Sequence, residues 1–335
     1  MAYKMIHNRF SILTQMAKEK NFSGHIYITD GHESFELCKG LENHITKCLI
    51  TKDSVFPIAS GTKFLTALAI GMLIDQGKLS LDSYAKDILD LGIESYDPHI
   101  CIKHLLSHTS GIPDYLDESL QDLSNINNLK LLSIEDYISY FPHSKMEFIP
   151  GSKFRYNDGA FVYLALIIEK VSQMSYQTFI NEYLLKPLNI SQSGVFNTSL
   201  EKKHKVMGYI DSKRTIPHIG YIPEMAGGDG GAYMNAYDFH MITRSFLDGK
   251  IICSTLVKEF MTPQIKTDEG DDIFYGYGLW LKKCNNDYIP YVIGVDAGIR
   301  FKSMFIKNHF YFIATNTNDD IWDMMEEMDK ILCNA

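Results

Sequence analysis

The sequence predicts a mixed α/β (α+β) fold, in which an antiparallel sheet built from both chain ends is flanked by helices and carries an inserted, mainly helical domain. Strand-like alternation of apolar residues occurs near the start of the chain and again late in it. Between these two parts, the apolar residues follow helical spacing. A single sheet that takes strands from both ends is the economical way to combine these patterns.

The N-terminal part is expected to begin with a helix over residues 6–18, followed by a β-hairpin. Residues 23–29 alternate in the way typical of a strand, and residues 34–38 supply the second arm. The turn signal between them is Asp30 followed by Gly31.

The central block is predicted to be helical, and the late part returns to strands. Helices are expected over residues 64–76, 163–171 and 176–185. Strands and a last helix are expected over residues 275–281, 288–295, 302–306, 309–315 and 320–332.

These patterns predict two domains. The sheet domain comprises residues 1–60 and 226–335, and the inserted helical domain comprises residues 61–225. We expect the active site in the cleft between them.

Composition and charge place the chain among globular proteins. Of its 335 residues, 45% are apolar and 22% are charged, which excludes a disordered or fibrous chain. The formal net charge of −9, without a dense basic segment, argues against nucleic acid and membrane surfaces as partners. A small-molecule or peptide substrate is the expected partner, and no sequence feature indicates an oligomeric state.

The cysteines and histidines show no metal-binding spacing. The six cysteines lack a Cys-x-x-Cys pair, so we expect neither a zinc site nor a disulfide framework, and the thiols are predicted to be buried and reduced. Twelve histidines without a His-x-x-x-His pair on an expected helix leave metal-dependent hydrolysis unsupported. We expect no metal and no cofactor.

The first 21 residues carry several charges and no apolar stretch long enough for a signal peptide or a membrane span. A cytoplasmic location is therefore expected, unless a leader that preceded this sequence has been removed.

The most informative local feature is Ser60-Gly61-Thr62-Lys63 at the start of the apolar helix over residues 64–76. A lysine in the first turn of a helix is disfavoured by the helix dipole, and burial adds a desolvation cost. Both effects lower the pKa of Lys63 and favour its neutral amine. The three-residue spacing places this amine beside the Ser60 hydroxyl, as a catalytic base requires.

Five ordered sequence blocks resemble those of the serine β-lactamase and penicillin-binding protein superfamily, which includes class C β-lactamases, D-Ala-D-Ala carboxypeptidases and esterases. The resemblance covers most of the chain and implies a β-lactamase/transpeptidase-like fold. The blocks lie at residues 56–63, 77–82, 104–113, 150–158 and 227–233.

The resemblance places Tyr156 on the tyrosine of the family's Tyr-x-Asn motif, where its phenol would serve as general base and acid. Asp158 occupies the asparagine position of this motif, which is a departure from the family. A carboxylate there raises the pKa of Lys63 and opposes its use as a base. Tyr156 is then the preferred base.

The family's last motif, Lys-Thr-Gly or His-x-Gly, matches Val292-Ile293-Gly294, so that Val292 replaces the basic residue. A register three residues later, ending at Gly298, also fits and again puts a valine at that position. The backbone N–H groups of Ser60 and Val295, or of Gly298 in the later register, are the expected oxyanion hole. The missing base disfavours a dedicated β-lactamase.

Three further residues were weighed for a role in the site. By resemblance to a family loop, Tyr115 is placed in the cleft, with a surface aromatic as the alternative. Arg300 is a candidate replacement for the missing positive charge, with a solvated strand residue as the alternative. We interpret His108 as structural and reject it as the base of a Ser-His-Asp triad.

Together these residues predict a serine hydrolase that works through an acyl-enzyme. The expected substrate is an ester, amide or peptide, as for an esterase or a D-amino-acid peptidase or carboxypeptidase, with weak β-lactamase activity as a further option. The alternative is a catalytically silent protein that keeps the fold for binding or as a scaffold, motivated by Asp158 and Val292.

Overall fold

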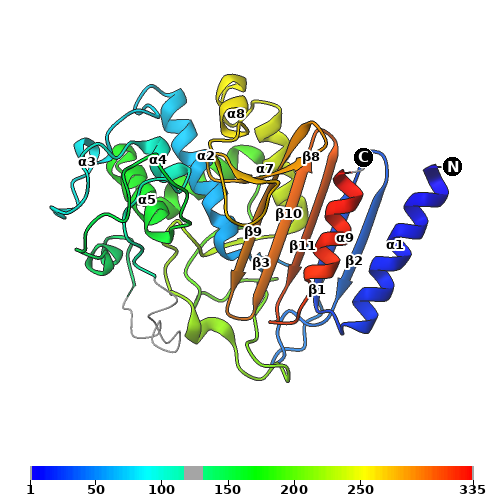
Figure 1. Cartoon of the computed structure of the whole chain (residues 1–335). Coiled ribbons are helices and arrows are strands. Elements are labelled where there is room, and N and C mark those ends of the chain that lie inside the picture. Colours follow the sequence, from blue (N-terminus) through cyan, green and yellow to red (C-terminus); the bar gives the residue numbers. More distant parts are fainter. Residues whose placement is uncertain (1, 117–130, 334–335) are drawn as a thin grey trace.

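A computed structural model describes residues 2–116 and 131–333, and an eight-stranded antiparallel sheet forms its centre (Figure 1). The N-terminal hairpin pairs with the last strand, and every pair in the sheet is antiparallel. The predicted sheet from both chain ends is therefore confirmed. In spatial order, the strands are β2 (Ser34–Lys39), β1 (Gly24–Thr29), β11 (His309–Thr315), β10 (Ile299–Ile306), β9 (Asp287–Asp296), β8 (Trp280–Cys284), β7 (Ile273–Tyr275) and β6 (Ile265–Lys266).

Helices cover both faces of the sheet, because its central strands are apolar on both sides. On β11, Tyr311 and Ile313 pack in one buried cluster with α1 (Ala2–Glu19) and α9 (Trp322–Cys333). Phe310 and Phe312 point to the opposite face and join the main core. That core contains residues of α7 (Ala236–Leu247) and α8 (Ser254–Phe260).

The helical block packs around α2 (Thr62–Asp75), which is apolar on nearly all sides and almost completely buried. It lies against α5 (Asp158–Ser172). Shorter helices complete the block: α3 (Ala85–Ile88), α4 (Ile102–Leu106), η3 (Glu135–Tyr140), α6 (Tyr176–Phe179), η4 (Ile180–Leu185), η5 (Lys186–Leu188) and η6 (His218–Tyr221). A small second sheet pairs β5 (Ala232–Met234) with β3 (Phe56–Pro57) and β4 (Gly194–Val195).

One predicted strand is wrong in its extent. Residues 275–281 form the end of β7 and the start of β8, with a turn between them. Gly278 has φ +73°, and a Cβ there would lie 2.2 Å from the Cβ of Ala67, so this turn fits against α2 only with glycine.

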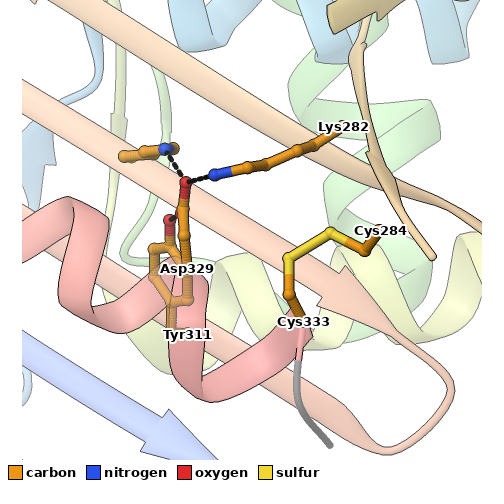
Figure 2. Close-up of a disulfide and its surroundings, with 6 residues drawn as sticks. Lys282, Cys284, Tyr311, Asp329 and Cys333 are labelled. Carbon is orange, nitrogen blue, oxygen red and sulfur yellow. Dashed lines mark hydrogen bonds and ion pairs between the residues drawn. A yellow bond between two sulfur atoms is a disulfide. The ribbon is translucent and has the colours of Figure 1, made fainter. Parts of the chain in front are cut away.

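The prediction of reduced, buried thiols is wrong as well. Cys284 of β8 is joined by a disulfide to Cys333 of α9, 49 residues further along the chain (Figure 2). Cys48 and Cys253 are exposed. Spacing did not reveal the pair, because only the packing of α9 on the sheet brings the two cysteines together.

The predicted division into a sheet domain, residues 1–60 and 226–335, and an inserted helical domain, residues 61–225, stays a prediction. Within the ranges that the structure covers, there is no helix with both the length and the apolar character needed to span a bilayer.

Candidate active site

Ser60 lies in a single 3-10 turn, η1 (Ala59–Gly61), immediately before α2. The turn is fastened to β5, because the Ile58 N–H donates to the Ala232 carbonyl at 3.0 Å. Ala59 has φ +46°, a left-handed conformation that costs about 1 kcal/mol or more for a residue with a side chain. The fold thus holds strained backbone directly before the proposed nucleophile.

Lys63 is the second residue of α2, and its side chain is only 2% exposed. Its amine donates to the Ser60 Oγ at 3.1 Å, to the Asp158 Oδ1 at 2.5 Å and to the Asp229 carbonyl at 2.9 Å. Three acceptors match the three protons of an ammonium group. The predicted proximity of Ser60 and Lys63 is thus present.

The pKa of Lys63 differs from the first expectation. Burial lowers it, but the negative charge of Asp158, with smaller contributions from Tyr156 and Asp229, outweighs burial and raises it above the ordinary value. The prediction that burial and the helix dipole make Lys63 a neutral amine is therefore wrong, whereas the expected effect of Asp158 is present. The lysine is an ammonium group at neutral pH.

Tyr156 lies two residues before α5, and its ring is held between two others. Trp280 stacks on it with ring centroids 5.9 Å apart, and His108 lies at 4.3 Å. The Lys63 Nζ is 5.0 Å from the ring centroid. Burial, which outweighs the opposing charge of Lys63, raises the pKa of Tyr156 above its ordinary value, and the charge of Asp158 adds to this.

His108 is fully buried, and both its ring nitrogens are engaged away from Ser60. Its Nδ1 accepts the Asn157 N–H at 3.1 Å, and its Nε2 lies 3.1 Å from the Tyr275 hydroxyl. Burial holds its pKa well below the ordinary value. This geometry agrees with a structural histidine that supports the ring of Tyr156.

A cleft of about 520 Å³ opens over Ser60. Of the residues predicted for the site, it is lined by Ser60, Tyr115, Tyr156, Asp158, Gly294 and Val295. Tyr115 is buried, and its hydroxyl donates to the Asp229 Oδ2 at 2.6 Å. The alternative of a surface aromatic is therefore wrong.

The strand beside Ser60 fits the first of the two registers. A Cβ at Gly294 would lie 2.1 Å from the Ile58 carbonyl oxygen, so only glycine allows this approach. Val292, at the position of the basic residue in the resembled family motif, is buried in the core and supplies no positive charge.

Gly298 and Arg300 lie at the β9–β10 connection and are absent from the described lining of the cleft. The Arg300 Nη1 donates to the Ile299 carbonyl at 2.8 Å and to the Asp296 carbonyl at 3.2 Å. The Arg300 guanidinium therefore stabilises the turn between β9 and β10, and the structure does not bring it to Ser60.

Among the acidic residues of the cleft that sequence reasoning missed are Asp114 and Asp229. Asp114 accepts the backbone N–H groups of Asp158 at 2.8 Å and Gly159 at 3.0 Å, at the start of α5. Burial, followed by the charge of Asp158, raises the pKa of Asp114 to about 7. Their positions, beside Tyr115 and inside the glycine-rich block at residues 227–233, were the available signals.

One group of possible metal ligands occurs in the part of the chain that the structure describes. The ligand atoms of His25, Glu36 and Cys38 lie within 4.8 Å of one another on the β1–β2 hairpin. The His25 Nε2 is 3.0 Å from the Glu36 Oε1. These residues do not line the cleft and offer nothing to the chemistry at Ser60.

The fold and this site define a protein of the serine hydrolase type, and comparison with known proteins gives the family. Residues 23–328 match the family model described as Beta-lactamase, so the chain belongs to the beta-lactamase family.

Two comparisons illustrate the relationship. The chain is 26% identical over 289 residues to penicillin-binding protein 4* of Bacillus subtilis (strain 168), covering 80% of this chain and 61% of that protein. It is similar, with a TM-score of 0.87 and 30% identity, to the crystal structure of a penicillin binding protein from Bacillus halodurans, covering 95% of this chain and 98% of that one. The chain spans less than two thirds of the length of the curated relatives that it matches first.

A more distant comparison shows the fold alone. The D-amino acid amidase from Ochrobactrum anthropi SV3, complexed with L-phenylalanine amide, has a TM-score of 0.80 at 18% identity and covers 97% of both chains. Together with the structure from Bacillus halodurans, it confirms the predicted β-lactamase/transpeptidase-like fold.

Proposed function

We propose that this protein is a serine acyl hydrolase in which Ser60 forms an acyl-enzyme with an ester, amide or peptide. The observation that carries the proposal is the hydrogen bond from the Lys63 amine to the Ser60 Oγ at 3.1 Å. Ser60 and Tyr156 both line the cleft. A buried lysine held against a serine on a strained turn has no evident value for folding alone.

In this mechanism, the Tyr156 phenolate accepts the Ser60 proton and becomes a phenol, and the serine oxygen attacks the carbonyl carbon. The Lys63 ammonium stabilises the phenolate before this transfer, because Asp158 keeps the lysine charged. The backbone N–H groups of Ser60 and Val295 are the proposed oxyanion hole. Tyr156 then returns the proton to the leaving group, and water or an amine releases the acyl group.

The cleft favours esters and D-amino-acid amides or peptides over β-lactams. Val292 supplies no positive charge for a substrate carboxylate, and Arg300 is bonded to its own turn. Among the structural relatives are an amidase and a D-stereospecific amidohydrolase from Streptomyces sp., which supports amide substrates.

The test is intact-mass analysis after incubation with a fluorophosphonate, a penicillin and an activated ester. We expect an adduct with at least the fluorophosphonate or the ester, absent in Ser60→Ala. Inertness toward all three would overturn the proposal and favour the catalytically silent scaffold. The hydrogen bond from the Lys63 ammonium to Asp158, which keeps the lysine charged, is the observation that favours this alternative.

A further inference from the structure

The described lining of the cleft over Ser60 is strongly acidic. Its carboxyl groups come from five separate parts of the chain, which the fold brings together in the lining of one cleft. They belong to Asp114, Asp158, Asp229, Glu269 and Asp296, against a single cation in this lining, Arg155.

The cations of this region already have acceptors. Arg155 forms an ion pair with Glu147 at 2.8 Å. Lys63, behind the lining, donates to Ser60, Asp158 and Asp229. A substrate carboxylate would therefore meet a negative field, and a substrate cation an attractive one.

Asp114 is the carboxyl group that gains most from a bound cation. The Asp114 side chain lies against the first residue of α5, because it accepts the backbone N–H of Asp158 at 2.8 Å. The two carboxyl groups repel each other, and this repulsion together with burial raises the pKa of Asp114 to about 7. The Asp158 carboxylate has Lys63 as its partner, whereas the groups that bond to Asp114 are backbone amides.

We infer that the acyl part of the substrate carries a positive charge, such as a protonated amine, and that Asp114 binds it. This inference rests on the proposed function, because it concerns the molecule that acylates Ser60. It makes Asp114 a determinant of specificity, and it predicts poor acceptance of penicillins and of peptides with a carboxylate near the scissile bond.

Three fluorophosphonates with the same spacer, ending in an ammonium, a hydroxyl or a carboxylate group, test the inference through the rate at which Ser60 is labelled. The ammonium probe should react about tenfold faster than the hydroxyl probe, the size of one charge-assisted contact. The carboxylate probe should be slowest. Asp114→Asn should abolish the advantage of the ammonium probe over the hydroxyl probe.

Asp136→Asn is the matched control, because Asp136 also accepts two backbone N–H groups, from Leu132 and Ser133, but is absent from the cleft lining. Should Asp114→Asn fail to fold, added salt on the natural protein must reduce the ammonium advantage. Equal rates for the three probes would overturn the inference while Ser60 labelling upholds the function. Labelling by none of them would overturn the function itself.

Discussion

At the scale of single residues, the charge state of Lys63 decides how Ser60 is activated. The ammonium group has three acceptors, and Asp158 holds its pKa above the ordinary value. A protonated lysine accepts no proton, so the chemistry requires Tyr156 as the base, with Lys63 as the charge that makes its phenolate accessible.

Replacing Tyr156 by phenylalanine tests this assignment. Ser60 acylation by an activated ester should fall by about 100-fold or more, since a general base contributes this much. In the natural protein, the acylation rate should rise with pH beyond the ordinary tyrosine pKa, because burial raises the pKa of Tyr156. Stopped-flow measurement at several pH values reports both effects.

Tyr163→Phe is the control, because the Tyr163 hydroxyl donates to the Leu89 carbonyl at 2.6 Å, outside the cleft lining. A Tyr156→Phe protein that acylates at the natural rate would exclude the phenol as the base.

Asp158→Asn restores the residue of the family motif and gives a second prediction. Without this carboxylate, the pKa of Lys63 falls, because its strongest charge partner is removed. The same carboxylate raises the pKa of Tyr156, so its removal favours the phenolate, and the rising part of the pH–rate profile should move toward lower pH. Asp82→Asn, which breaks the exposed pair with Lys103, should leave the profile in place. An unmoved profile in Asp158→Asn would argue against this electrostatic effect of Asp158.

Sequence predicts the Ser60–Lys63 contact because helical spacing alone brings residues three apart together. Asp114 and Asp229 were missed because the approach of Asp114 to Asp158, and of Asp229 to Lys63, depends on loops that no local pattern describes. For Lys63, the sequence indicated both burial, which lowers the pKa, and Asp158, which raises it, but the balance between them depends on the distance between the two side chains in the folded protein.

At the scale of elements, the cleft depends on how the end of β9 meets the η1 turn. The pairing of β8 with β9 stops at Trp280, the first residue of β8, which lies opposite Tyr291. Residues 292–296 of β9 therefore pair with β10 alone. Their other edge faces the turn that carries Ser60, and Gly294 allows the close approach.

Gly294→Ala should therefore damage the site. The added Cβ would lie 2.1 Å from the Ile58 carbonyl, which forces the turn of Ser60 away from β9. We expect labelling of Ser60 by a fluorophosphonate to slow at least tenfold, together with a loss of stability of about 1–3 kcal/mol. Gly77→Ala is the control for a glycine replacement that costs stability away from the site, because its φ of +68° strains any side chain while a Cβ there meets nothing within 4 Å. Natural labelling rates in Gly294→Ala would contradict the proposed role of this contact.

Most elements follow from the sequence, because period-2 and helical patterns are set by which face is buried. The hairpin of β1 and β2 and the strands β9, β10 and β11 lie where alternation predicts them. The turn between β7 and β8 was missed, because its cause is the contact of Gly278 with Ala67 of α2, far away in sequence.

At the scale of the whole molecule, α9 is fastened to the sheet by two devices (Figure 2). The disulfide joins Cys333 of α9 to Cys284, at the other end of β8 from Trp280. Nearby, Asp329 accepts hydrogen bonds from Lys282 at 2.7 Å, Lys302 at 2.8 Å and the Tyr311 hydroxyl at 2.5 Å. These contacts hold the C-terminal helix α9 to strands β8, β10 and β11, while the cleft residues lie elsewhere.

Cys333→Ser should therefore lower stability without impairing the site. Opening a crosslink across 49 residues costs about 2–4 kcal/mol, measurable as a lower unfolding midpoint in urea. The rate of Ser60 labelling below the transition should stay within about twofold. Cys253→Ser, at an exposed free thiol, is the control. A midpoint equal to that of the control would contradict a stabilising disulfide.

The most direct test of the central claim is to locate the acyl group during turnover. The protein is quenched with acid while it hydrolyses an activated ester, digested, and its peptides are sequenced by mass spectrometry. We predict the acyl group on Ser60, with both the adduct and turnover lost in Ser60→Ala. Turnover that persists in Ser60→Ala, or an acyl group found only elsewhere, would contradict Ser60 as the nucleophile.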